Sequence, residues 1–102
     1  MKYNKLFRDK LPEIIKEKGE IPITHIAEDK EYWIKLKEKL SEEVQEFLEE
    51  STEEELADIL DVVDAICDFK KINKEDLENL KKEKFEKCGG FNEKIILDEV
   101  KD

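Results

Sequence analysis

Apolar residues recur at helical spacing over two long stretches of the chain, and this periodicity constrains the fold more than any other feature. The stretches cover residues 30–50 and 53–70, with one short break between them at Ser51 and Thr52. Apolar side chains three and four residues apart share one face of a helix. The sequence therefore predicts two amphipathic helices that fold back on each other as an antiparallel pair.

The apolar surface of the second predicted helix is broader than one partner helix can cover. The first helix places these residues on one face: Trp33, Leu36, Leu40, Val44, Phe47 and Leu48. The second presents a wider set: Leu56, Ile59, Leu60, Val62, Val63, Ile66 and Cys67. A helix that is apolar over so wide an arc packs on more than one side. We therefore expect an all-α, antiparallel helical bundle that a second copy completes as a four-helix arrangement.

Residues that start and stop helices set the expected boundaries of the first two. Pro12 suits the first turn of a short helix that runs to about Lys18. Gly19 follows as the residue that ends it. Asp29 can cap the long helix over about residues 30–50.

The same signals predict two further helices. Thr52 and Glu55 form a capping-box pattern at the start of a helix that runs to about residue 70. Asn73 can cap a third long helix, which the glycines at positions 89 and 90 end.

Two short β-prone segments flank the helices. Residues 21–27 (IPITHIA) and 94–100 (KIILDEV) favour extended structure. We expect them to pair as a small two-stranded ribbon within a single domain that spans residues 1–102.

The charge of the chain excludes one class of partner. The 102 residues include 29 acidic and 19 basic side chains, for a formal net charge of −10. An acidic protein repels nucleic-acid backbones, so we expect no nucleic-acid polymer as a partner. The chain has no apolar run of transmembrane length and no signal-peptide pattern, so we expect a cytoplasmic protein with no membrane partner.

Two acidic motifs lie on the neighbouring predicted helices. Glu42, Glu43 and Glu46 belong to the first, and Glu55 and Asp58 to the second. Acids on helices are most often solvated surface residues. Helical phase, however, places several of these at the edge of the apolar face or inside it, where an unpaired acid is costly.

The stretch between Ser41 and Asp68 contains many Glu and several Asp but no Lys or Arg. Acids gathered in one place raise one another's pKa unless a cation neutralises them. A Ca²⁺ loop of the EF-hand type is absent, and the lone histidine, His25, lies outside these helices, which disfavours a di-iron site. Mg²⁺, with Mn²⁺ as a substitute, is the cation that this pattern favours.

Three segments together resemble the all-α NTP pyrophosphohydrolases, which include MazG-like proteins. The first is the pair of acidic motifs, EE-x-x-E followed by E-x-x-D. The second is the opening YNKLFRDKLP, and the third is the late K-x-x-K-x-GGF. The opening and the ending are similar to a small phosphoribosyl-ATP pyrophosphohydrolase-like subgroup of that superfamily.

The resemblance implies Mg²⁺-dependent hydrolysis of a nucleoside triphosphate between the α and β phosphates. The products would be the monophosphate and pyrophosphate, and the role could be house-cleaning of nucleotide pools. It also implies a homodimer or a dimer of dimers. By position in the motif, the metal ligands would be Glu43, Glu46, Glu55 and Asp58. Glu42 could orient water or act as a base, and Asp61 is a further candidate ligand.

Cationic side chains must hold the leaving pyrophosphate in such a reaction. Arg8, the only arginine in the chain, and Lys10 are the first candidates, followed by Lys84 and Lys87. A guanidinium binds phosphate with two parallel hydrogen bonds. Pairing of Arg8 with a nearby acid is an equally reasonable role for it. Trp33 could stack on a base, although core packing is the better interpretation.

Two other functions are compatible with the sequence. One is a non-catalytic helical module whose acidic face docks a basic partner. The other is a metal-binding regulatory relative that has the fold without turnover.

Overall fold

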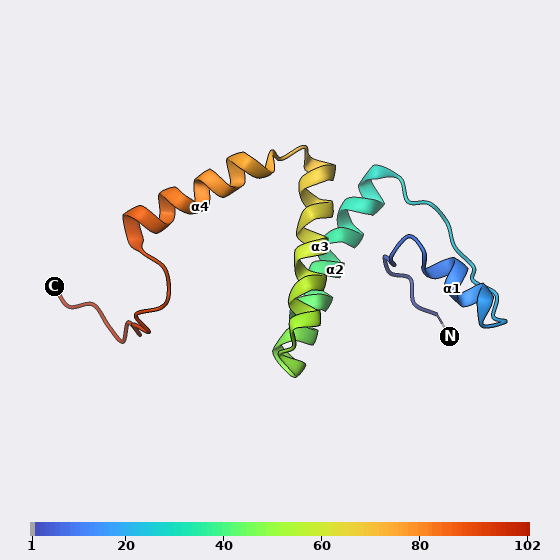
Figure 1. Cartoon of the computed structure of the whole chain (residues 1–102), viewed down its shortest axis with the longest axis horizontal. Helices are drawn as coiled ribbons and strands as arrows, with labels where there is room; N and C mark the ends of the chain where they lie inside the picture. The colour runs from blue at the N-terminus through green and yellow to red at the C-terminus, as the bar shows by residue number, and fades with distance from the viewer. Residues whose placement is uncertain (1) are drawn as a thin grey trace. The chain divides into compact units, whose positions relative to one another are not determined.

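The computed structural model describes residues 2–102, and this range contains four helices and no strand (Figure 1). In chain order they are α1 (Leu11–Glu17), α2 (Asp29–Glu50), α3 (Glu53–Lys70) and α4 (Lys74–Cys88). The chain divides into two compact units, the first ending at Lys71 and the second running from Ile72 to Asp102. The all-α class is thus confirmed, while the single domain and the association of copies stay predictions.

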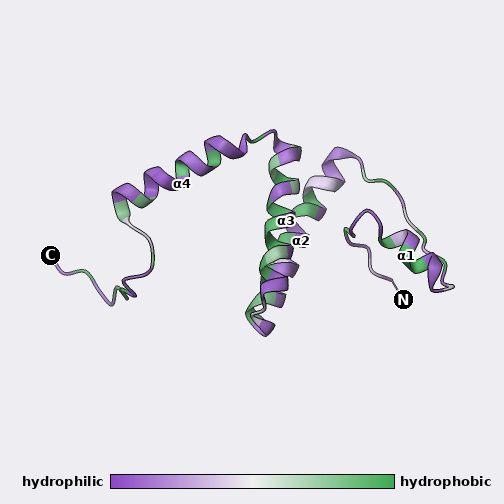
Figure 2. Cartoon of the chain, viewed as in Figure 1, coloured by the Kyte–Doolittle hydropathy of each residue, from purple (hydrophilic) through white to green (hydrophobic). Residues whose placement is uncertain are grey.

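Helices α2 and α3 lie side by side in the first unit, and a two-residue turn joins them (Figure 1). Apolar and hydrophilic residues alternate along both helices (Figure 2). Leu36 on α2 and Cys67 on α3 are the most enclosed apolar side chains among the described residues, at 1% and 3% exposure. The predicted antiparallel pair is therefore present, with a thin core between its two helices.

Aromatic side chains close one end of the pair. The ring of Trp33 stacks on that of Phe69, with centroids 5.9 Å apart and planes inclined by 18°. Tyr32 meets Phe69 edge to face at 5.1 Å. The Lys70 ammonium lies 4.7 Å from the Trp33 centroid. Such contacts add about 0.5–1.5 kcal/mol each beyond the burial of area. Trp33 therefore has the packing role that its place on the apolar face predicts.

Local signals explain where α2 ends and α3 begins. Ser51 adopts a left-handed conformation, and its amide donates a hydrogen bond to the Phe47 carbonyl at 2.7 Å. The Thr52 hydroxyl accepts a hydrogen bond from the Glu55 amide at 3.4 Å. The expected Thr52 cap is thus present, and it fixes the first turn of α3.

The other helix ends agree with the sequence except at one cap. The Asn73 side chain accepts hydrogen bonds from the amides of Glu75 and Asp76, at 2.8 and 3.1 Å. Gly89 follows α4 with φ of +79°, a conformation that favours glycine. The predicted Asp29 cap is wrong, because Asp29 is the first residue of α2 and Glu28 occupies the cap position.

The predicted two-stranded ribbon is wrong as well. Residues 21–27 and 94–100 are both non-helical coil without strand pairing. In the first segment, Ile21, Ile23 and Ile26 are 87–96% exposed, so that no face of a strand is buried. An isolated pair of strands is marginal in water without a buried face. Alternating apolar residues alone therefore do not suffice to predict strands in these two segments.

Part of the expected bundle core faces outward in the single chain. Leu48, Leu56 and Leu60 are 64%, 46% and 64% exposed. These three residues form what we call the outer leucine surface of α2 and α3. In the part of the chain that the structure describes, no helix is both long and apolar enough to cross a membrane.

The enclosure of Leu36 makes it the sharpest test of the packing between α2 and α3. Replacement Leu36→Ala removes a fully buried side chain and leaves a cavity, so we expect the free energy of unfolding to fall by about 2–5 kcal/mol. Ile26→Ala, at a 95% exposed position, is the control, with an expected change within about 0.5 kcal/mol. Urea denaturation followed by circular dichroism measures both. Equal effects of the two substitutions would contradict the observed core.

Candidate metal-binding site

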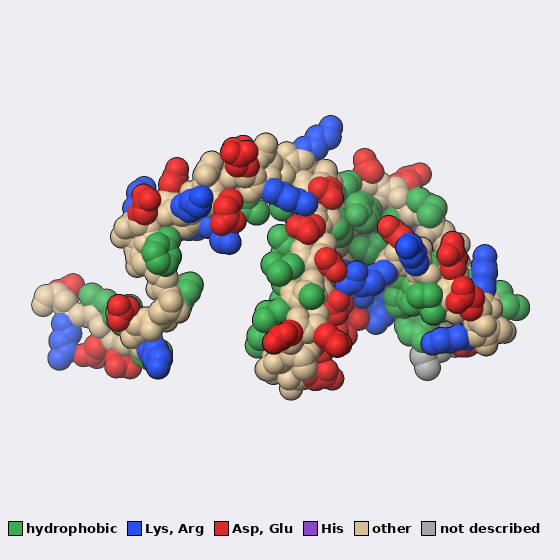
Figure 3. Space-filling model, viewed as in Figure 1, with side chains coloured by type: hydrophobic (Ala, Val, Ile, Leu, Met, Phe, Trp, Pro, Cys, Tyr) green, Lys and Arg blue, Asp and Glu red, His purple; other side chains and the backbone are tan. Residues whose placement is uncertain are grey.

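Three carboxylates of α2 gather at one place. Glu42, Glu43 and Glu46 each offer an oxygen, and these oxygens lie within 4.8 Å of one another. Their spacing along the helix explains this, because residues three and four apart project from neighbouring turns on one face. Figure 3 shows acidic side chains along the α2–α3 pair, with basic side chains next to them. We call these three residues the α2 carboxylate cluster.

Two buried carboxylate oxygens lack hydrogen-bond partners among the described residues. They are Oε2 of Glu43, at the centre of the cluster, and Oε2 of Glu55, in the first turn of α3. Glu43 is 6% exposed and Glu55 9% exposed. A buried acceptor without a partner destabilises a fold, and it does so more strongly when it is charged. These oxygens, as hard anionic donors, fit the ligand set that Mg²⁺ prefers.

The α3 acids are not part of the α2 carboxylate cluster. The neighbouring Glu50 carboxyl raises the pKa of Glu55. The Asp58 carboxylate accepts a hydrogen bond from Arg8 Nη2 at 2.6 Å. The structure thus brings Glu43 and Glu46 together, whereas the full set with Glu55 and Asp58 as metal ligands stays a prediction.

Basic side chains from outside the acidic stretch neutralise part of its charge. Lys5 Nζ lies 2.7 Å from Oε1 of Glu42. Lys39 Nζ lies 3.4 Å from Glu42 and 3.3 Å from Glu43. The stretch itself has no Lys or Arg, as the sequence shows, but Lys5 and Lys39 from before it neutralise part of its charge.

Lys39 and Lys5 differ in how far the sequence could have revealed them. Lys39 precedes Glu42 and Glu43 by three and four residues, a spacing that predicts contact on a helix. The Lys5 contact joins residues 37 positions apart and depends on tertiary structure. No local pattern indicates such a contact.

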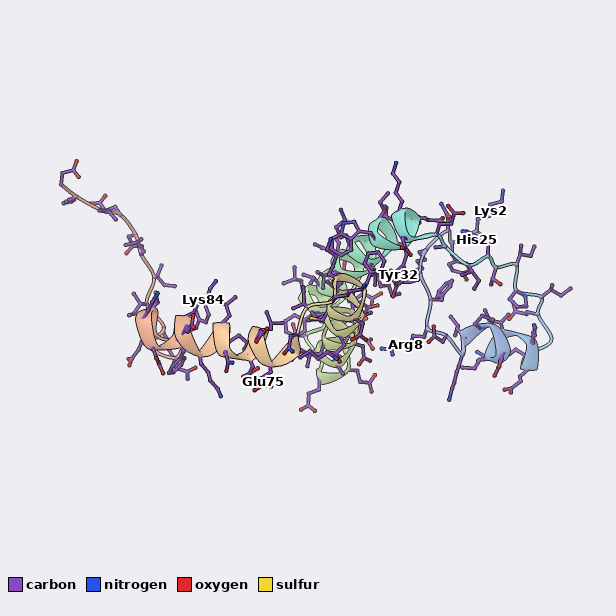
Figure 4. All side chains as sticks on the ribbon, turned by 90° about the horizontal axis from the view of Figure 1, so that it is seen from above. Lys2, Arg8, His25, Tyr32, Glu75 and Lys84 are labelled. Carbon is purple, nitrogen blue, oxygen red and sulfur yellow. The ribbon has the colours of Figure 1, made fainter. Side chains whose placement is uncertain are left out.

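Arg8 pairs with two acids of α3. Its Nη2 lies 2.6 Å from Asp58 Oδ1 and 2.9 Å from Asp61 Oδ2. Figure 4 labels Arg8 in the non-helical segment before α1. The alternative in which Arg8 pairs with an acid is thus observed, although the partners are Asp58 and Asp61 and not the acids nearest in sequence. Its role toward phosphate stays a prediction.

The pKa values of Glu42 and Glu46 are shifted in opposite directions. The charge of Glu43 raises the pKa of Glu46 above its ordinary value of 4.5. The hydrogen bond from Lys5 lowers the pKa of Glu42, which Lys39 lowers further. Glu42 is therefore held ionised, while the charge of Glu43 makes ionisation of Glu46 more costly.

The remaining predicted phosphate-binding residues are exposed lysines. Lys10 is exposed just before α1. Lys84 and Lys87 are exposed on α4, in the second unit, where Lys84 lines an open pocket with Phe85 and Phe91. Their role stays a prediction.

His25 is engaged elsewhere. Its Nε2 lies 2.9 Å from Oε1 of Glu31, near the start of α2. This contact joins the segment before α2 to the first turn of that helix.

Comparison with known proteins finds one partial relative. A protein of Mycolicibacterium smegmatis, described only as uncharacterized, is 46% identical to this chain over 41 residues. The matching part covers 40% of this chain and 42% of that protein. No family model matches the chain, and no solved structure matches it.

The raised pKa of Glu46 gives a pH-dependent prediction for the metal-free protein. A folded-state pKa above the ordinary value means that ionised Glu46 destabilises the fold at neutral pH. We therefore expect Glu46→Gln, without divalent cations, to raise the melting temperature at pH 7 by about 1–4 °C. The gain should disappear as the pH falls through the raised pKa toward 4.5, because the folded wild type then takes up the proton first.

Glu49→Gln is the matched control, since it removes one charge from an exposed position on the same helix. Melting curves of the wild type and both variants between pH 4 and pH 7 measure the difference. A gain for Glu46→Gln no larger than that for Glu49→Gln would contradict repulsion by Glu43.

Proposed function

We propose that this chain is a divalent-cation-dependent nucleotide pyrophosphohydrolase. It would hydrolyse a nucleoside triphosphate between the α and β phosphates to the monophosphate and pyrophosphate, with Mg²⁺ as the cation and Mn²⁺ as a substitute. The observation that carries the proposal is the buried, unpartnered Oε2 of Glu43, inside a cluster of three carboxylates. An unpartnered buried carboxylate does not stabilise the packing of two helices, whereas a bound cation would satisfy it.

The residues have distinct roles in this proposal. Glu43 and Glu46 would hold the cation from α2, and Glu55 and Asp58 would complete its shell from α3. When bound, the cation neutralises phosphate charge and lowers the pKa of an attacking water. Glu42, which Lys5 keeps ionised, would orient that water. Arg8 and Lys10 are the proposed contacts of the phosphates.

The outer leucine surface supports association of copies. Leu48, Leu56 and Leu60 are exposed apolar residues on the same two helices that carry the acids. Exposed apolar surface of this kind is typical of a protein–protein interface. We propose that a second copy covers it, as a homodimer or a dimer of dimers.

Loss of a ligand gives the direct test of catalysis. We expect Glu46→Gln and Asp58→Asn each to lower turnover by about a hundredfold or more, with unchanged helical circular dichroism. Glu49→Gln, on the same helix, should keep wild-type turnover. Release of pyrophosphate from a panel of nucleoside triphosphates with Mg²⁺ or Mn²⁺ is the measurement. Wild-type turnover in Glu46→Gln would contradict the ligand assignment.

Melting with and without the cation separates catalysis from the other two functions. A protein that binds the cation when folded melts at a higher temperature in its presence. A rise with the cation but no turnover on any nucleotide would identify a metal-binding relative. No rise and no turnover would leave an acidic interaction module.

The proposed association has its own test. Leu60→Asp places a charge in the outer leucine surface, so we expect the dissociation constant between copies to rise by about 10- to 100-fold. Ile26→Asp, exposed outside the helices, is the control and should leave association unchanged. Light scattering after size exclusion gives the mass of each species. A wild type that is monomeric at high concentration would refute the association.

A further inference from the structure

The Arg8 side chain pairs with Asp58, one of the residues that the proposed function assigns as metal ligands. The guanidinium contacts Asp58 at 2.6 Å and Asp61 at 2.9 Å. The two acids lie one turn apart on α3, so the single nitrogen Nη2 donates a hydrogen bond to each. The guanidinium contacts Oδ1 of Asp58, and a cation bound to the same carboxylate would repel it at such short range.

The segment that carries Arg8 is held independently of the guanidinium. Phe7 is half-buried, and its ring lies against that of Tyr3 with centroids 5.4 Å apart. The ammonium groups of Lys5 and Lys39 each lie 5.8 Å from the Phe7 centroid. Lys5 also pairs with Glu42. The Arg8 side chain can therefore leave Asp58 while the backbone of its segment stays in place.

The exposure of the contact makes such a departure easy. The Arg8 side chain is 62% exposed, and those of Asp58 and Asp61 are 38% and 57% exposed. Ion pairs in contact with solvent are weak, because water and salt compete with them. A divalent cation with further ligands on α2 would therefore displace the guanidinium from Asp58.

We propose that Arg8 is an intramolecular substitute for the divalent cation: it neutralises Asp58 and Asp61 when the metal is absent and exchanges with the metal at Asp58. Metal binding then releases the only guanidinium of the chain beside the metal, where an anionic ligand can take it up. This inference rests on the proposed function, because it requires that Asp58 bind the cation.

Metal affinity tests the exchange without any turnover. Removal of a competing cation should strengthen binding, so we expect Arg8→Gln to bind Mn²⁺ about two- to fivefold more tightly than the wild type. Lys16→Gln is the matched control: it loses the same charge from an exposed position on α1, and its affinity should equal that of the wild type. Electron paramagnetic resonance of free Mn²⁺ measures the bound fraction in each case.

The side-chain NMR signal of Arg8 separates exchange from a general effect of charge. Since the chain has one arginine, its side-chain Nε–H resonance needs no assignment. We expect Mg²⁺ to shift this resonance toward that of free arginine. The Mg²⁺ concentration at half of the shift should equal the concentration at half-maximal Mg²⁺ binding. Mg²⁺ binding that leaves the resonance unmoved, or equal Mn²⁺ affinity of Arg8→Gln and the wild type, overturns the exchange alone. No binding of either cation by the wild type or Arg8→Gln overturns the proposed function and the exchange with it.

Discussion

The packing of α2 against α3 is the interaction on which the rest of the structure depends. It encloses Leu36 and Cys67, and it also removes the carboxylates of Glu43 and Glu55 from water. Apolar burial stabilises the pair, whereas burial of a carboxylate without a partner opposes it. The core is thin, so the two acids offset an appreciable part of its gain. Buried acids that lower the stability of the fold are typical of functional sites, where they bind a ligand.

Charge balance in this unit is achieved over long distances in the sequence. The acidic stretch has no cation of its own, and Lys5, Arg8 and Lys39 supply positive charge from before it. These contacts are of unequal strength. Lys39 is largely shielded and lies on the same helix as its partners, while the Arg8 pairs are open to solvent. The Arg8 pairs are therefore the contacts that a competing ion would break most easily.

The parts of the fold that the sequence predicted are those with local causes. Helical periodicity and caps such as Thr52 and Asn73 act within a few residues, and the structure agrees with them. The ribbon failed because pairing of distant strands depends on buried area that neither segment has. At the site, one-turn spacing predicted the grouping of Glu43 with Glu46. The pairing of Arg8 with Asp58 and Asp61, 50 and 53 residues away, depends on tertiary structure and left no local signal.

The turn at Ser51 and Thr52 has a consequence for how this chain can vary in length. Each residue added to an α-helix rotates all later residues of that helix by about 100°. One residue inserted between Thr52 and Glu55 would therefore turn a different acid toward α2 and carry Asp58 away from Arg8. Substitutions on the solvated faces of either helix have no such effect. The solvated positions between Glu46 and Glu55, such as Glu49, should thus tolerate changes of residue type far better than this region tolerates insertions or deletions.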